Sequence, residues 1–144
     1  MTDACPSTLV ARYAEYDAAF STRNARRLQS IETSNFKDTD PDGTQRTLTE
    51  ATENQSRFFA MAHRLHLQSS VRCRERSGNQ ISTVARMSLT GSYTPSKSHE
   101  HRFSQVYINH DLWQHIAGTW RLVSQTTVRL DGVDNGKPVH IKLR

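Results

Sequence analysis

The sequence predicts an α+β domain whose helices lie in the first half of the chain and whose sheet is built by the second half. Residues 9–20 place apolar side chains at helical spacing, whereas residues 120–130 alternate between two faces with a period of two. More alternating segments, rich in β-branched and aromatic residues, follow one another from residue 63 onward. Helices followed by a run of strands are typical of folds in which the helices pack on one face of an antiparallel sheet.

Two helices are expected at the start of the chain. Ser7 or Thr8 can cap the first helix, which we expect to run to about Ser21. Its inward-facing side chains are Leu9, Tyr13, Tyr16 and Phe20. Asn24 is expected to cap a short second helix that turns Leu28 toward the core.

A tight turn and a third helix come next. Residues 40–43, Asp-Pro-Asp-Gly, predict a turn because proline presets φ at the second position and glycine tolerates the closing conformation. This turn joins short strands expected at 35–39 and 44–46. Thr47 and Glu50 have the spacing of a capping box. The third helix is therefore expected to begin at Leu48 and to end near Ala62.

The first long hairpin is expected to turn through a three-residue loop at 77–79. That loop pairs Arg76 with Gln80 and places Val71 on the same face as Ala85. A two-residue loop would instead set Val71 opposite an arginine, so we favour three residues.

The second long hairpin joins a strand at 102–113 to a strand at 119–130 through the step Gly118–Thr119. Residues 110–117 are either an extension of both strands or an inserted flap. In the last strand, the side chains expected to face the helices are Trp120, Leu122, Ser124 and Thr126, and those expected to face away are Arg121, Val123 and Gln125. Residues 131–144 form a tail, either a turn with a short strand or a disordered end.

Length and composition indicate one domain over residues 1–144, with its core at 7–130. Arginine supplies most of the positive charge behind the net +5, but it is scattered and forms no basic stripe with aromatic residues, so no nucleic-acid partner is expected. The sequence has no run of about 18 apolar residues and no signal peptide. We therefore expect no membrane partner and a cytoplasmic location.

Cys5 and Cys73 are expected to stay reduced, because Cys5 lies in a segment expected to fray. The sequence contains no Cys-x-x-Cys pair. Histidine pairs at positions 63 and 66, and at 99 and 101, lack an accompanying carboxylate cluster. No metal and no other cofactor are expected.

Three stretches carry a family resemblance over residues 7–130. They are the paired helices with Tyr13, Phe20, Asn24 and Leu28, the segment NFKDTDPDGT, and the ending RFSQVYIN followed by GTWRLVSQTT. Together they resemble the nuclear-transport-factor-2-like superfamily, closest to its small bacterial SnoaL-like and ketosteroid-isomerase-like members. The resemblance implies a cone-shaped fold with three N-terminal helices on a strongly curved antiparallel sheet, enclosing a pocket. Members include isomerases, dehydratases, epoxide hydrolases, polyketide cyclases and non-catalytic modules, so the fold alone does not select a function.

A ketosteroid-isomerase-type site needs a carboxylate that removes a proton next to a carbonyl group and a donor that stabilises the enolate. Asp38 or Asp40 is the candidate base, and Tyr13 or Tyr16 is the candidate donor. A second carboxylic acid would be expected on the concave face of the sheet. The side chains predicted to face inward include none, which argues against an isomerase.

The expected pocket is aromatic and mainly apolar, which suits a small apolar or aromatic ligand. Its expected lining is Tyr13, Tyr16, Phe58, Phe59, Met87, Leu89, Phe103, Tyr107 and Trp120. The leading hypothesis is a ligand-binding protein. The alternatives are a cofactor-independent isomerase, dehydratase or cyclase, and a non-catalytic structural or interaction module.

The outer face of the sheet is expected to form a homodimer interface. Its apolar centre is Val84, Val106, Ile108 and Val123, and it is flanked by Arg86 and Arg121. An apolar centre surrounded by arginine is typical of such interfaces, because a monomer would leave the patch in water.

Overall fold

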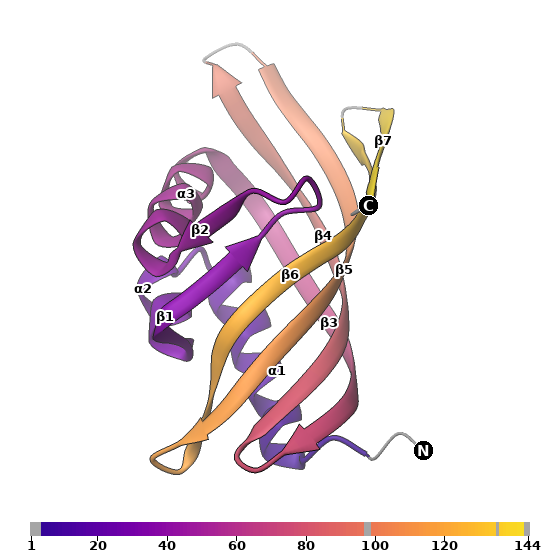
Figure 1. Ribbon diagram of the computed structural model, residues 1–144. Helices are drawn as coiled ribbons and strands as arrows, with labels where there is room; N and C mark the ends of the chain where they lie inside the picture. Colours follow the sequence, from indigo (N-terminus) through magenta and orange to yellow (C-terminus); the bar gives the residue numbers. More distant parts are fainter. Residues whose placement is uncertain (1–3, 97–98, 135, 143–144) are drawn as a thin grey trace.

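The computed structural model describes residues 4–96, 99–134 and 136–142. Within these residues the chain forms three N-terminal helices and a curved, open sheet, which confirms the predicted α+β class (Figure 1). The elements in chain order are α1 (Ser7–Ser21), α2 (Ala25–Ile31), β1 (Glu32–Thr39), β2 (Gln45–Thr47), α3 (Leu48–Met61), β3 (Ala62–Ser77), β4 (Gln80–Ser96), β5 (His99–Ile116), β6 (Thr119–Asp134) and β7 (Lys137–Lys142). None of the helices in the described part of the chain is long and apolar enough to cross a membrane.

Helix α1 has the predicted extent, but its start differs from the expected cap. The N-cap residue is Pro6, and no side chain caps the helix, so neither Ser7 nor Thr8 has the predicted role. The Thr8 hydroxyl instead accepts a hydrogen bond from the Trp120 indole N–H at 3.0 Å. This bond ties the first turn of α1 to the start of β6.

The other two helices begin as the sequence predicts. The Asn24 side chain accepts a hydrogen bond from the Arg27 backbone N–H at 3.1 Å, which caps α2. At α3 the Thr47 hydroxyl accepts from the Glu50 N–H, and the Glu50 carboxylate accepts from the Thr47 N–H. This reciprocal pair is the predicted capping box.

The sheet has the strand order β2-β1-β6-β5-β4-β3, and β7 pairs with the free part of β6. All neighbouring strands are antiparallel except β1 and β6, which run parallel, so the sheet is mixed rather than wholly antiparallel. The parallel pairing sets Asp38 in β1 beside Gln125 in β6. The end of β1 is thereby brought to the middle of the sheet.

The β5–β6 hairpin settles the alternatives for residues 110–117. They continue β5 to Ile116, and the turn is Ala117–Gly118, one residue before the expected step. Both turn residues have positive φ, 50° and 82°, which is the backbone that two-residue hairpins prefer. The segment is therefore a strand extension. The tail likewise contains a strand, because β7 pairs with β6 along its described length.

The β3–β4 turn is shorter than predicted. Ser77 pairs with Gln80 across a two-residue loop, so the expected three-residue loop is wrong. A register shift between Cys73 and Glu75 adds one residue to β3 and restores the expected pairing beyond it. Val71 therefore still pairs with Ala85.

Two register shifts in β6 change which of its side chains face the helices. Val123 and Val128 have no partner in β5, and each adds one residue to β6. After the first shift, Gln125 pairs with Asp111 and turns to the concave side. The prediction that Ser124 faces the helices while Gln125 faces away is thus wrong, because one inserted residue reverses the alternation.

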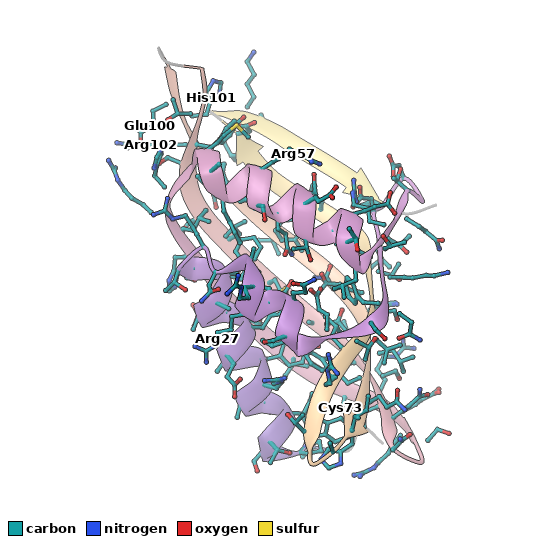
Figure 2. The ribbon with its side chains drawn as sticks, turned by 90° about the vertical axis from the view of Figure 1, so that its left-hand side faces the viewer. Arg27, Arg57, Cys73, Glu100, His101 and Arg102 are labelled. Carbon is teal, nitrogen blue, oxygen red and sulfur yellow. A yellow bond between two sulfur atoms is a disulfide. The ribbon has the colours of Figure 1, made fainter. Side chains whose placement is uncertain are left out.

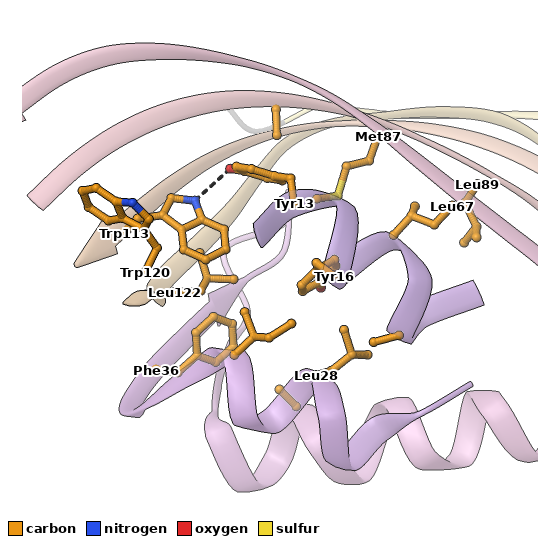
Figure 3. Packing of buried hydrophobic residues seen from close by; sticks show 14 of the residues in the cluster. Tyr13, Tyr16, Leu28, Phe36, Leu67, Met87, Leu89, Trp113, Trp120 and Leu122 are labelled. Atoms are coloured by element: carbon orange, nitrogen blue, oxygen red, sulfur yellow. Dashed lines mark hydrogen bonds between the residues drawn. The ribbon is translucent and has the colours of Figure 1, made fainter. Parts of the chain in front are cut away.

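The core lies between α1, α2 and the concave face of the sheet (Figure 3). Leu9, Leu28, Ile31, Trp113 and Leu122 are all completely buried. They come from two helices and two strands, so the same apolar cluster fixes α1 and α2 on the sheet.

A disulfide joins Cys5 to Cys73, contrary to the expectation of two reduced thiols. The start of α1 packs beside β3, which brings the two Cα atoms to 5.2 Å, within the usual range for a disulfide. Cys73 lies near the end of β3 (Figure 2). The argument for a reducing compartment, which rested on a frayed Cys5, therefore no longer applies.

We predict that a Cys5→Ser, Cys73→Ser double variant loses about 2–4 kcal/mol of unfolding free energy, because the cross-link spans 68 residues and restricts the unfolded chain. Urea unfolding of both proteins measures the difference. Thiol alkylation followed by mass spectrometry of the unreduced parent is the control. Two alkylated cysteines in the folded parent would contradict the disulfide.

Candidate functional site

A cavity of about 280 Å³ lies between α1, α3 and the concave face of β1, β3, β4, β5 and β6. Its apolar lining residues are Phe20, Phe58, Leu67 and Leu89. Its polar lining residues are Asp38, Asp40, Asn54, Gln55, Gln105, Asn109, Gln125 and Thr127, and the tyrosines Tyr16 and Tyr107 complete the lining. The cavity is amphipathic, whereas the sequence predicted an aromatic pocket with few polar groups. The β6 register shifts explain part of the difference, because they turn Gln125 and Thr127 inward.

Both candidate aspartates line this cavity, but their carboxylates differ. The Asp40 carboxylate forms an ion pair with Arg46 at 2.7 Å, whereas the Asp38 carboxylate is 3.8 Å from the same guanidinium group. Burial, reinforced by the charge of Asp40, raises the pKa of Asp38 to about 6, although Arg46 opposes the shift. The protonation of Asp38 therefore changes near pH 6.

Several amide groups around the cavity have polar atoms without strong partners. Among the described residues, Gln125 Nε2 and Gln55 Oε1 are buried and have no hydrogen-bond partner. The Asn109 Nδ2 donates only to the Met87 sulfur, at 3.3 Å, while Thr127 donates to the Asn109 Oδ1 at 2.8 Å. Sulfur is a weak acceptor, so the Asn109 amide remains available to a better one. Unpaired buried donors and acceptors mark positions where a ligand can place polar atoms.

Tyr13 lies behind the cavity in a closed hydrogen-bond cluster. Its hydroxyl donates to Asp111 Oδ2 at 2.6 Å and accepts from the Trp113 indole N–H at 2.9 Å (Figure 3). The Thr83 hydroxyl, at 2.7 Å, supplies the remaining contact. One donated and two accepted bonds use the full capacity of a phenol. Tyr13 therefore has no hydrogen bond left for a ligand.

Asp111 is a buried carboxyl group on the concave face, whereas from the sequence it was considered only as a residue that could reach the rim of the pocket. It continues the alternating series in β5 formed by Phe103, Gln105, Tyr107 and Asn109. Burial raises its pKa to about 7, and bonds from Tyr13 and Gln125 oppose the shift. Its Oδ1 atom has no partner of good geometry within the described residues, although the Gln125 amide is close enough to lower its pKa. The expected inward series ended at Asn109, one step of the alternation before Asp111.

Tyr16 lies in the cavity lining, and Glu32 is buried close enough to affect its pKa. Tyr16 lines the cavity, and its hydroxyl has no hydrogen-bond partner among the described residues. Burial, with Glu32 and Asp38 nearby, raises its pKa well above the usual value, so the hydroxyl stays protonated. Glu32 is buried at the junction of α2 and β1, and burial raises its pKa to about 8. No periodic pattern in the sequence marks this glutamate.

The remaining predicted pocket residues divide between the cavity and the core. Phe58, Leu89 and Tyr107 line the cavity as expected. The others lie outside its lining and pack in the core, namely Phe59, Met87, Phe103, Trp120 and Tyr13. Met87 is adjacent to the cavity through its contact with Asn109.

The predicted interface residues lie on the outer side of the sheet. Val84, Val106 and Ile108 are half-buried in the single chain, and the β4–β5 pairing places Ile108 opposite Arg86. Val123 is the unpaired residue of the first β6 shift. The Arg121 guanidinium group already donates one hydrogen bond within the chain, to the Glu32 carbonyl oxygen at 2.5 Å.

No group of three or more metal-ligating side chains comes together in the described ranges 4–96, 99–134 and 136–142. His101, one of the histidines weighed as a ligand, stacks on Tyr93 with ring centroids 5.1 Å apart.

The arrangement is similar to solved structures with the nuclear-transport-factor-2-like fold. A protein assigned as an aromatic ring hydroxylase from Novosphingobium aromaticivorans has a TM-score of 0.75 at 12% identity, over 86% of this chain and 90% of that one. A protein assigned as a dehydratase of the NTF2-like family from Streptomyces avermitilis has a TM-score of 0.70 at 10% identity, over 84% and 92%. A hexachlorocyclohexane dehydrochlorinase, LinA Type2, has a TM-score of 0.66 at 15% identity, over 96% and 88%.

These similarities confirm the cone-shaped fold that the sequence resemblance implies. At identities of 10–15% they establish the fold and leave the reaction open. The sequence matches no family model and no curated protein.

The two buried tyrosines of α1 give a matched test of the cluster around Asp111. We predict that Tyr13→Phe lowers the unfolding free energy by about 2–3 kcal/mol, because it leaves Asp111 and the Trp113 indole without a partner. Tyr16→Phe removes a hydroxyl that bonds to no described residue and is expected to cost less than about 1 kcal/mol. Urea unfolding of both variants measures the difference, and equal losses would contradict the assigned cluster.

Proposed function

We propose that the cavity binds a small organic molecule that carries a carbonyl group, and that Asp38 moves a proton on the carbon next to that group. The observation that carries this proposal is one cavity that combines a carboxylate of pKa about 6 with unpaired amide donors. Such proton transfer requires two groups, and the first is a base whose pKa lies near the working pH. The second is a hydrogen-bond donor that stabilises the negative charge developing on the carbonyl oxygen.

The donors for that negative charge are Gln125, Asn109 and Tyr16. Gln125 Nε2 forms no hydrogen bond of good geometry within the described residues, although it lies near the Asp111 carboxyl group. Asn109 Nδ2 donates to the Met87 sulfur, and the protonated Tyr16 hydroxyl has no described hydrogen-bond partner. Tyr13 is excluded from this role because its hydroxyl is fully engaged. Of the two candidate tyrosines, we therefore assign the donor to Tyr16.

The step conserves atoms and electrons without a cofactor. Asp38 takes the proton from the carbon, and the C–H electron pair moves to form a C=C bond while the carbonyl π pair moves to the oxygen. The donors hold the resulting enolate. Protonated Asp38 then returns the proton to the same or another carbon, which gives exchange or isomerisation, or a leaving group departs, which gives elimination.

Elimination is also the chemistry named in two structures of the same fold, a dehydratase and a dehydrochlorinase. The apolar wall of Phe20, Phe58, Leu67 and Leu89 suits the hydrocarbon body of such a molecule. A pocket that binds without turnover uses the same wall and the same amides, and the experiment below separates the two functions.

We predict that the protein catalyses deuterium incorporation next to the carbonyl of small aryl ketones, measured by proton NMR in heavy water with 1-indanone and 4-phenylbutan-2-one. Asp38→Asn should lower the rate at least about a hundredfold, because it removes the base. The parent rate should rise with pH up to about 6 and then level off, since the base acts in its deprotonated form and its pKa is raised to about 6.

The matched control is Asp42→Asn, an exposed aspartate of the neighbouring turn whose backbone contact an asparagine can retain. Its rate should equal that of the parent. If the parent bound the ketones saturably but catalysed no deuterium exchange, the result would support a binding function and refute the proton-transfer proposal. An Asp38→Asn rate equal to the parent rate would do the same.

We also propose that two copies pair through the outer face of the sheet. Val84, Val106 and Ile108 form adjacent apolar positions on β4 and β5, and the exposed Arg86 lies among them. A second copy would remove this apolar surface from water and let arginine form the polar rim.

A Val106→Glu, Ile108→Glu double variant is expected to be monomeric in native mass spectrometry at a concentration where the parent is dimeric, because the two added carboxylates would lose their hydration in the interface. Ser56→Glu, on the exposed side of α3, is the control and should leave the dimer intact. A monomeric parent would refute the pairing. Co-purified small molecules would appear in the same spectra as added mass.

A further inference from the structure

A second cavity of about 240 Å³ adjoins the first, at the carboxyl end of α3. It is lined by Phe58, Met61, Tyr93, Phe103, Gln105 and Asp134. Phe58 and Gln105 line both cavities, so the two share a wall. We call this second cavity the distal cavity. It lies where β4 and β5 continue past α3, and His101 in β5 lies beyond one end of that helix (Figure 2).

The distal cavity has aromatic walls. The Phe103 ring is 6.0 Å from the Phe58 ring and 5.8 Å from the Tyr93 ring, both at tilted angles. Met61 is more than one-third exposed, an unusual position for a large apolar side chain unless something covers it. Tilted rings and a flexible methionine form a surface that receives a flat apolar group.

Asp134 gives this aromatic cavity one polar anchor. Its Oδ2 atom accepts a hydrogen bond from the Tyr93 hydroxyl at 2.9 Å. Its Oδ1 atom is enclosed and has no hydrogen-bond partner among the described residues, and His101 Nδ1 lies 4.0 Å from it. A buried carboxylate oxygen that accepts no hydrogen bond costs folding free energy. A ligand that donates a hydrogen bond to this oxygen would offset that cost.

One face of α3 connects the two cavities. Gln55 lines the first, Phe58 lines both and Met61 lines the second, and the three residues are spaced by three along the helix. From Gln55 to Met61 the helix rises roughly 9 Å. A single elongated molecule can therefore have one end beside Asp38 and the other beside Asp134.

We infer that the distal cavity is a second subsite of the same binding site and that it takes an aromatic ring bearing a hydrogen-bond donor, which bonds to Asp134. This inference rests on the proposed function, since it describes the far end of the same substrate. The substrate class is then an elongated ketone whose remote end is a phenol. Met61 and Phe103 hold the ring, and Asp134 selects the hydroxyl.

The test uses two probes that differ only in the donor, 4-(4-hydroxyphenyl)butan-2-one and its methyl ether. Methionine methyl groups labelled with ¹³C report by NMR where each probe binds, because Met61 lines the distal cavity and Met87 contacts Asn109 in the first. The Met61 resonance is assigned with a Met61→Leu variant. Titration should shift Met61 saturably, and the phenol should bind at least about fivefold more tightly than the ether.

The decisive variant is Asp134→Asn, and Glu53→Gln on the exposed side of α3 is its control. Asp134→Asn should reduce the preference for the phenol over the ether to less than about twofold, while Glu53→Gln should retain it. A preference that survives in Asp134→Asn, or a Met61 resonance that does not move, would overturn the subsite.

Failure of the subsite and failure of the proposed function have different signatures. Asp38→Asn should keep both the Met61 shift and the preference for the phenol while it loses deuterium exchange. A parent protein that shows the shift and the preference without exchange would uphold the subsite and refute proton transfer. Exchange without a Met61 shift would uphold proton transfer and refute the subsite.

Discussion

The hydroxyl group of Tyr13 fixes how the helices sit on the sheet. It joins α1 to Thr83 of β4 and to Asp111 and Trp113 of β5, and it uses every hydrogen bond that a phenol can make. All four groups are buried, so a small shift of α1 would leave several polar atoms unpaired at once. Because Tyr16 follows by three residues on the same helix, the bonds of Tyr13 also determine where the Tyr16 hydroxyl enters the cavity.

The helices and long strands could be predicted because their periodicity is local and extends over many residues. The sequence correctly placed α1, the cap at Asn24 and the box at Thr47. It missed the register shifts in β3 and β6, since one extra residue leaves no mark in composition. The error in the β3–β4 loop was cancelled by such a shift, whereas the shift at Val123 reversed the facing of Gln125.

The candidate site could be predicted in part. Asp38 and Asp40 were identified near the end of a short strand and Tyr16 on the inward stripe of the first helix, because carboxylates and tyrosines suit proton transfer, and all three line the cavity. Asp111 could have been found by continuing the β5 alternation for one more step. The inward position of Gln125 depends on a register shift, and the burial of Glu32 depends on a helix-to-strand junction. No pattern in the sequence indicates either one.

The disulfide divides the chain into a closed part and an open part. The covalent ring from Cys5 to Cys73 contains α1, α2, β1, β2, α3 and most of β3, while β4, β5, β6 and β7 lie outside it. The cavity is built from both parts, since Asp38 lies within the ring and Asn109 and Gln125 lie outside it. The disulfide therefore restrains only the wall that carries Asp38, whereas the wall that carries Asn109 and Gln125 is joined to the ring covalently through the β3–β4 turn alone.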